Sequence, residues 1–172
     1  IFSGVINIYD VEHPISVADC LRGEVHHLLS GNEATEYARR KGFPFHDPIT
    51  MSRFIEYRKA LKNREKFGTV GAVALDEDGI VCAGTSTGGI GNETPGRVSD
   101  SASVAGTYAD EVGGVSCTGK GEHIINQAVA GVPIPSISTS FPDALAVDLG
   151  VASSEASSFS IGYTGSSALI EL

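Results

Sequence analysis

The sequence predicts a mixed fold in which helices and strands follow one another along the chain, the α+β class. Two observations carry this prediction. Residues 68–89 read GTVGAVALDEDGIVCAGTSTGG, where two apolar stretches flank the turn residues Asp76–Gly79. Such an arrangement is typical of a β-hairpin, with Gly79 able to adopt positive φ. Residues 50–66, in contrast, place apolar side chains on one side and basic ones on the other, as an amphipathic helix does.

Local patterns predict the elements that precede the hairpin. Residues 1–9 (IFSGVINIY) are rich in β-branched side chains, which favours a strand. Ser16 is the expected N-cap of the first helix, and Gly42 is expected to end the second. The expected elements are a strand over 1–9, a helix over 17–22, a short strand over 25–30, and helices over 33–41 and 50–66.

Small and polar residues predict mostly short elements in the second half of the chain. Residues 88–100 contain too many Gly, Pro and Asn residues for a strand or a helix and are expected to form a loop. The other expected elements are hairpin strands over 69–75 and 80–85, a short helix or turn over 101–110, a strand over 113–118, a helix over 122–130, and a closing hairpin of 159–163 with 168–172.

Composition argues against several classes of function. The chain of 172 residues carries a formal charge of −9, which argues against a nucleic acid or an anionic membrane as a partner. No apolar run is long enough to span a bilayer, and we expect a cytoplasmic protein. The three cysteines form no CxxC pair and are expected to be free, buried thiols. The five histidines lack metal-ligand spacing, so we predict neither a metal nor another cofactor.

Hydroxyl side chains mark the open end of the predicted hairpin. Thr69 begins the first strand, and Thr85 and Thr87 end the second, so antiparallel pairing places both ends at one edge of the sheet. A threonine hydroxyl becomes a nucleophile when a base removes its proton, and its own α-amine is such a base once the preceding peptide bond is cut. Gly68 has no Cβ and leaves its carbonyl open to attack. On the residues alone, the pair is either a nucleophile with its cleavage site or only a turn.

The loop over 88–100 contains a second concentration of polar groups. An arginine in a glycine-rich loop is suited to bind a carboxylate with two parallel hydrogen bonds, and Arg97 is such a residue. Asp100 is suited to accept a substrate ammonium group. The alternative interpretation is a surface ion pair between these two side chains.

Four sequence blocks in the same order resemble those of a known family. They are GTVGAVALDEDG…TSTGG, PGRVSDS, GTYAD and VSCTGKGE. Together they are similar to the signature blocks of the isoaspartyl peptidase and plant-type L-asparaginase family, which are N-terminal-nucleophile hydrolases. The resemblance covers residues 1–130 and is strongest over 68–122. Ser99 departs from the family's usual glycine (GRVGDS), and residues 132–172 fit the family poorly.

The resemblance implies a fold and a set of residue roles. The fold is an αββα sandwich, possibly incomplete, in a single domain over residues 1–172, and self-cleavage between Gly68 and Thr69 divides it into an α part, 1–68, and a β part, 69–172. The implied roles are Thr69 as nucleophile, Thr87 as a hydrogen-bonding partner near its amine, Thr118 and Gly119 at the oxyanion, Arg97 on the substrate's α-carboxylate and Asp100 on its α-amine.

The activity that the resemblance implies is the release of aspartate from L-asparagine or β-aspartyl dipeptides by α/β units that pair as a homodimer. Two alternatives stay open. One is a glycosylasparaginase or a threonine aspartase on the same scaffold. The other is a non-catalytic remnant that acts as a binding subunit. It arises because Ile1 corresponds to the middle of the family's α part, so the section that supplies an asparagine and a sodium-holding loop is expected to be missing.

Overall fold

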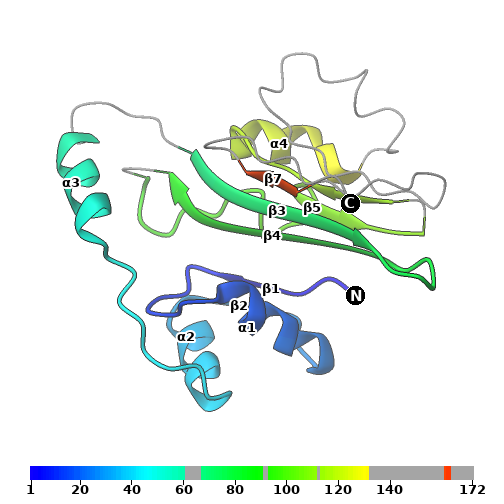
Figure 1. Cartoon of the computed structure of the whole chain (residues 1–172), viewed down its shortest axis with the longest axis horizontal. Helices are drawn as coiled ribbons and strands as arrows, with labels where there is room; N and C mark the ends of the chain where they lie inside the picture. Colours follow the sequence, from blue (N-terminus) through cyan, green and yellow to red (C-terminus); the bar gives the residue numbers. More distant parts are fainter. Residues whose placement is uncertain (61–66, 91–92, 112, 132–160, 164–172) are drawn as a thin grey trace. The chain divides into compact units, whose positions relative to one another are not determined.

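The computed structural model of the chain describes residues 1–60, 67–90, 93–111, 113–131 and 161–163 (Figure 1). These residues form both helices and strands, which confirms the predicted α+β mixture. By packing, the chain forms two units. The first consists of residues 1–66 and 90–98, and the second consists of residues 67–89 and 99–172.

In the described part of the first unit, the chain forms a pair of short parallel strands and three helices. Its strands are β1 (Gly4–Ile6) and β2 (Leu28–Ser30), and Val5 lies opposite Leu29 in their register. Its helical elements are α1 (Pro14–Cys20), the 3-10 turn Leu21–Gly23, α2 (Gly31–Arg40) and α3 (Met51–Ala60). Residues 61–66, which the sequence assigns to the last helix, lie outside the described residues.

Several boundaries in the first unit differ from the prediction, and two of the differences have a local cause. The strand expected over 1–9 is only three residues long, because Asn7 and Asp10 adopt positive φ of 51° and 55°, which ends the extended backbone. Ser16 is not the N-cap of α1. The helix begins at Pro14 with His13 as N-cap, since the fixed φ of proline suits the first helical position. The prediction that Gly42 ends α2 agrees with its φ of +88°.

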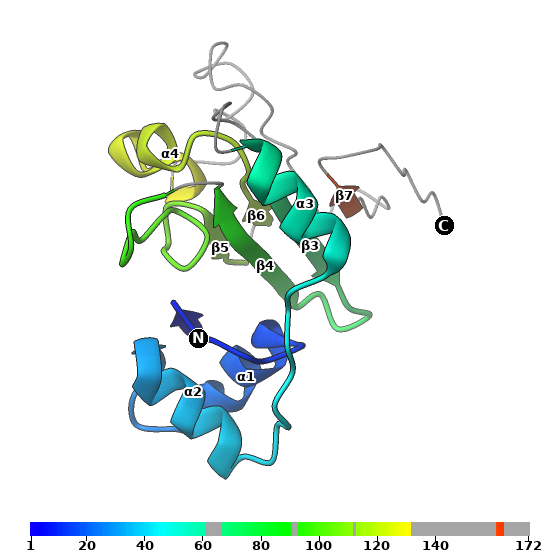
Figure 2. The same cartoon turned by 90° about the vertical axis from the view of Figure 1, so that its left-hand side faces the viewer.

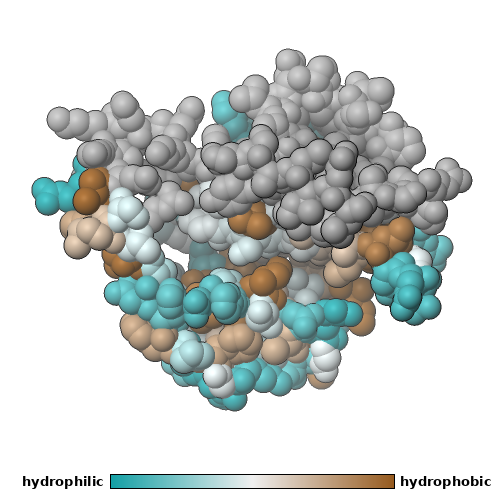
Figure 3. All heavy atoms as spheres, in the orientation of Figure 1, coloured by the Kyte–Doolittle hydropathy of each residue, from teal (hydrophilic) through white to brown (hydrophobic). Residues whose placement is uncertain are grey.

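The core of the first unit joins α1 to α2. Val17 and Leu21 lie one helical turn apart and are fully buried, and they pack with Tyr37 and Ala38 of α2. Hydrophilic residues cover much of the unit's surface, with apolar residues scattered among them (Figure 3). The segment 93–98 belongs to this unit and carries Arg97.

The second unit is built on the predicted hairpin (Figures 1 and 2). Strand β3 (Phe67–Leu75) lies between β4 (Val81–Ile90) and β7 (Ile161–Tyr163), and β7 is antiparallel to it. A second, two-stranded sheet pairs β5 (Thr107–Ala109) with β6 (Gly114–Ser116) in antiparallel fashion. Helix α4 (Gly121–Gln127) and the 3-10 turn Val129–Gly131 follow. No helix in the described ranges is long and apolar enough to cross a membrane.

Strand β4 is longer than the prediction allows. It continues through TSTGGI to Ile90, where a closing turn and the start of a loop were expected. The β-branched threonines favour extended backbone, and β3 begins early enough to lie beside them. Thr87, which was expected at the end of the second strand, therefore lies within β4 rather than at its end.

Other boundaries of the second unit shift by a few residues. The turn interpretation holds for the segment before β5, which itself is a strand rather than part of a helix. Helix α4 ends earlier than residue 130, because Ala128 adopts the left-handed conformation with φ of 48°. Strand β7 falls within the predicted strand over 159–163 but pairs with β3, and its expected partner over 168–172 lies outside the described residues.

The core of the second unit is aliphatic and rich in small residues, as the composition predicts. Its buried members are Val115 and Cys117 near β6, Ile124 of α4, and Val129 with Ala130. All three cysteines are free, as predicted. The expectation that all are buried is wrong, because Cys20 and Cys82 are exposed and only Cys117 lies in a core.

The packing of Cys117 predicts a difference in thiol reactivity. Burial, together with the charge of Asp100, raises the pKa of the Cys117 thiol to about 12, and only a thiolate reacts readily with alkylating reagents. At pH 7, a maleimide should therefore modify Cys20 and Cys82 in the native protein, and unfolding in denaturant should add a third label. Intact mass counts the labels. Three labels on the native chain would contradict the burial of Cys117.

Candidate active site

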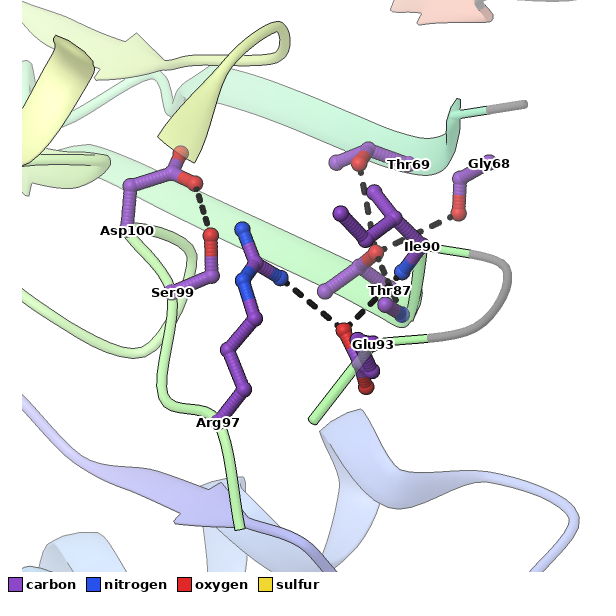
Figure 4. Close-up of polar contacts among 9 residues, drawn as sticks. Gly68, Thr69, Thr87, Ile90, Glu93, Arg97, Ser99 and Asp100 are labelled. Carbon is purple, nitrogen blue, oxygen red and sulfur yellow. Dashed lines mark hydrogen bonds and ion pairs between the residues drawn. The ribbon is translucent and has the colours of Figure 1, made fainter. Parts of the chain in front are cut away.

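The hairpin of β3 and β4 places the two predicted threonines next to each other. The Thr69 hydroxyl donates a hydrogen bond to Thr87 Oγ1 over 3.3 Å, and the Thr87 hydroxyl donates to the carbonyl oxygen of Gly68 over 3.4 Å (Figure 4). The backbone N–H of Gly89 donates to the same Thr87 oxygen at 3.1 Å. Both hydroxyl contacts are longer than the usual ~2.7–2.8 Å, which is common where a hydrogen bond shortens only around a bound substrate.

This cluster is open to a reacting group. Thr69 is partly exposed and Thr87 is exposed, so neither hydroxyl is sealed in the interior. Chain neighbours aside, no atom of the described residues lies within 4 Å of a Cβ added at Gly68, so none of them crowds that side of the backbone. The accessibility of the Gly68 carbonyl stays a prediction, and its oxygen accepts the Thr87 hydroxyl.

Arg97 is held by a carboxylate that the sequence analysis did not single out. Its Nη1 donates to Glu93 Oε2 at 2.9 Å, and the same oxygen accepts the backbone N–H of Ile90 at 3.1 Å (Figure 4). The backbone N–H of Arg97 also donates to the carbonyl oxygen of Thr94 at 3.0 Å. Glu93 thus connects the end of β4 to the guanidinium through one oxygen atom. The spacing of four residues between Glu93 and Arg97 was the feature of the sequence that could have indicated this ion pair.

Asp100 is a buried carboxylate rather than a surface group. Its residue is 5% exposed, and its Oδ1 accepts a hydrogen bond from the Ser99 hydroxyl at 2.8 Å (Figure 4). The Asp100 carbonyl accepts from both the N–H and the hydroxyl of Ser103, at 2.8 and 2.7 Å. The alternative interpretation, a surface ion pair with Arg97, is wrong in placing Asp100 at the surface. Ser99, the departure from the family pattern, supplies a hydrogen bond that a glycine cannot make.

A glycine makes room for the Asp100 turn. A Cβ on Gly106 would lie 2.5 Å from the Asp100 carbonyl oxygen and 2.7 Å from its Oδ2, so no larger residue fits here without a shift of the backbone. The carbonyl of Gly106 also accepts the N–H of Cys117 at 2.8 Å. Gly106 thereby connects Asp100 to the segment that leads into Thr118.

Thr118 and Gly119 follow β6. Thr118 is 7% exposed, and within the described part of the chain its hydroxyl has no hydrogen-bond partner. A buried hydroxyl in this situation costs free energy, on the order of 1–3 kcal/mol, unless something binds to it. Gly119 adopts a φ of 143°, a conformation that other residues rarely reach.

The structure thus brings Gly68, Thr69 and Thr87 into contact, as the sequence predicts. Asp100, Thr118 and Gly119 belong to the same unit, and Arg97 belongs to the first unit, where Glu93 binds it. The described residues contain no group of three or more side chains that could hold a metal ion.

Comparisons with known proteins agree with the motifs. The family model described as asparaginase matches residues 1–152, beyond the limit of residue 130 estimated from the motifs. The chain is 44% identical to an isoaspartyl peptidase/L-asparaginase of Synechocystis sp. over 146 aligned positions, covering 75% of this chain and 44% of the relative. It is 41% identical over 184 aligned positions to a plant-type L-asparaginase of Pyrococcus horikoshii, covering 94% of this chain and 58% of the relative.

A third curated relative is the isoaspartyl peptidase of Escherichia coli, 36% identical over 146 aligned positions, covering 73% of this chain and 46% of the relative. The chain spans about half the length of the curated relatives it matches. Because the family model matches most of its residues, this chain belongs to the asparaginase family.

Proposed function

We propose that this chain is part of a threonine-nucleophile amidohydrolase that releases aspartate from L-asparagine or from β-aspartyl dipeptides. One observation carries the proposal. The Thr87 hydroxyl contacts both the Thr69 hydroxyl and the Gly68 carbonyl oxygen, so a nucleophile, its partner and a cleavable bond lie together. The names of the relatives, isoaspartyl peptidase and L-asparaginase, support the substrate class.

The first step is self-cleavage. Thr69 Oγ1 attacks the carbonyl carbon of Gly68, and the Thr87 hydroxyl, which already donates to the Gly68 oxygen, stabilises the charge that develops there. The Thr69 nitrogen leaves with a proton, and an ester joins Gly68 to the Thr69 oxygen. Water hydrolyses this ester, which gives a Gly68 carboxylate and a free Thr69 α-amine. The products are the α part, 1–68, and the β part, 69–172, of one αββα domain.

Turnover then repeats this chemistry on the substrate. The Thr69 α-amine takes the hydroxyl proton, and Thr69 Oγ1 attacks the β-carbonyl carbon. The protonated α-amine then donates this proton to the leaving group, which departs as ammonia or as the amine of the second residue of the dipeptide. Water hydrolyses the remaining ester and releases aspartate. Thr118 and Gly119 bind the oxyanion, a role that fits the buried Thr118 hydroxyl and its lack of a partner among the described residues.

Recognition of the substrate depends on two charged residues. Arg97 binds the α-carboxylate with parallel hydrogen bonds, and Asp100 binds the α-ammonium. The burial of Asp100 strengthens this assignment, because a carboxylate in a low-dielectric environment gains more from an ammonium partner than an exposed one does. Two α/β units pair as a homodimer in this proposal.

The alternatives have less support. The names of the curated relatives do not favour a glycosylasparaginase or a threonine aspartase. A non-catalytic remnant has no need for the contact between Thr87 and the Gly68 carbonyl. A panel of asparagine, β-aspartyl dipeptides, a glycosylated asparagine and an aspartate-containing protein separates the enzyme classes by which amide is cut.

Replacement of Thr69 tests the proposed nucleophile. Thr69→Ala removes the attacking oxygen, so we expect one uncut chain by intact mass and no ammonia from asparagine. Thr69→Ser is the matched control, because it keeps the hydroxyl and should give both fragments at a reduced rate. Fragments that divide between residues 68 and 69 in the alanine variant would exclude Thr69 from self-cleavage.

Replacement of Glu93 tests how Arg97 is held. Glu93→Ala removes the oxygen that orients the guanidinium, so KM for asparagine should rise about tenfold while kcat changes little, as expected for a charge-assisted hydrogen bond of about 1.5 kcal/mol. Glu93→Gln keeps an acceptor oxygen for Arg97 and Ile90 and should retain most of the affinity. Steady-state kinetics with asparagine measures both constants. An unchanged KM in the alanine variant would show that Glu93 does not position Arg97.

A further inference from the structure

We propose that Thr85 is a positioning residue for the proposed reaction, acting through a row of hydroxyl groups with Thr107 and Ser116. This row sets the distance between the Thr69–Thr87 pair and the Thr118 hydroxyl. The inference rests on the proposed function, since it assigns a role to residues that contact neither the substrate nor the reacting atoms.

The row connects three strands of the second unit. Thr85 Oγ1 of β4 lies 2.6 Å from Ser116 Oγ of β6. Thr85 Oγ1 also forms a hydrogen bond with Thr107 Oγ1 of β5, which in turn contacts the carbonyl oxygen of Ser101 at 2.8 Å. Thr107 and Ser116 are 8% and 5% exposed. Short hydrogen bonds between buried hydroxyls hold strands more firmly than contacts exposed to water.

The Thr107 hydroxyl is the donor at one end of the row. It donates toward both Thr85 Oγ1 and the Ser101 carbonyl oxygen, so its single proton is shared between two acceptors. Between Thr85 and Ser116 either hydroxyl can donate. Loss of the Thr85 hydroxyl therefore removes one acceptor from Thr107 and breaks the contact with Ser116.

Strand β3 lies directly against β6 at Ser116, which is also a member of the hydroxyl row. A Cβ on Gly71 would collide with Ser116 Oγ and would lie 2.7 Å from Ser116 Cβ, so only a hydrogen atom fits. Two residues along, a Cβ on Gly114 would lie 2.7 Å from Cγ1 of Val73. Gly71 thus faces Ser116, and Val73 faces Gly114. Strands β3 and β6 therefore run in opposite directions where they face each other.

Strand β4 keeps a matching register with β6. Thr85 faces Ser116 in the hydroxyl row, and a Cβ on Gly114 would lie 3.5 Å from the Cβ of Ala83. Strands β4 and β6 therefore run in the same direction where they face each other. Both registers advance in steps of two residues, the spacing of side chains on one face of a strand.

One further step in either register reaches the proposed reacting groups. Thr69 precedes Gly71 by two residues, and Thr87 and Thr118 follow Thr85 and Ser116 by two. Both registers, continued by one step, place Thr118 opposite the Thr69–Thr87 pair. A shift of the hydroxyl row therefore shifts the nucleophile relative to the oxyanion group, and a misplacement of about 1 Å can cost ~100-fold in rate.

Thr85→Val is the decisive variant, because valine has the same shape but no hydroxyl. We expect kcat for asparagine and the rate of self-cleavage, followed by timed cell-free synthesis and gel analysis, each to fall at least about tenfold. KM should stay within about threefold, since Arg97 and Asp100 are untouched. Thr85→Ser keeps the hydroxyl and should restore both rates.

A control separates positioning from stability. Thr35 Oγ1 accepts the N–H of Tyr9 at 3.0 Å in the first unit, so Thr35→Val also removes one hydroxyl from a contact between a loop and helix α2. It should lower Tm by a similar amount and leave kcat unchanged. If Thr85→Val does not fold, Thr107→Val removes the hydrogen bonds to Thr85 and to the Ser101 carbonyl but keeps the contact between Thr85 and Ser116, so it should lower kcat about threefold, less than loss of the central hydroxyl.

The outcomes distinguish this inference from the proposed function. If the unaltered chain splits and hydrolyses asparagine while Thr85→Val does so at the same rates, the positioning role is wrong and the proposed function stands. Equal losses of kcat in the Thr85 and Thr35 variants would also overturn the positioning role. If the unaltered chain neither splits nor releases ammonia, the proposed function fails and the positioning role fails with it.

Discussion

The pairing of β3 with β4 is the constraint on which the candidate site depends. It turns two threonines eighteen residues apart into neighbours whose oxygen atoms are 3.3 Å from each other. A strand pair fixes side chains by register, and a slip of one residue would move either hydroxyl to the opposite face. The Gly89 N–H that donates to Thr87 adds a backbone contact at the same point, so the orientation of this hydroxyl does not depend on side chains alone.

Small residues let β6 approach this hairpin closely, which the proposed placement of Thr118 opposite the Thr69–Thr87 pair requires. Gly71 and Gly114 lie where a methyl group would collide with the facing strand, so the separation of the backbones is near its minimum. Close packing makes such a contact stiff, because neither strand can move without opening a gap or creating a clash. At these two positions glycine is a condition for contact between the strands.

Sequence patterns predicted the hairpin, its turn and the threonine pair, because these depend on residues close together in the chain. The positive φ of Gly79, +80°, belongs to that local group. Contacts between distant segments were not predictable in the same way. Nothing in GTYAD or VSCTG indicates that Thr107 and Ser116 meet at Thr85, and Glu93 looked like one of many surface acids until its contact with Arg97 was seen. The end of β4 was misjudged because glycine and serine suggest a turn, whereas pairing with β3 keeps them extended.

The burial of Asp100 has an electrostatic consequence for the proposed chemistry. A carboxylate withdrawn from water is unfavourable unless hydrogen bonds and an opposite charge offset its lost hydration. The Ser99 hydroxyl supplies one of these hydrogen bonds. The charge of Asp100 also acts on Cys117, since it contributes to the raised pKa of that thiol. A substrate ammonium would bring the opposite charge to a position where the dielectric screening is weak. In the proposed function, binding energy is thereby concentrated at the α-amine, one of the two groups, with the α-carboxylate, that distinguish asparagine and β-aspartyl dipeptides from a simple amide.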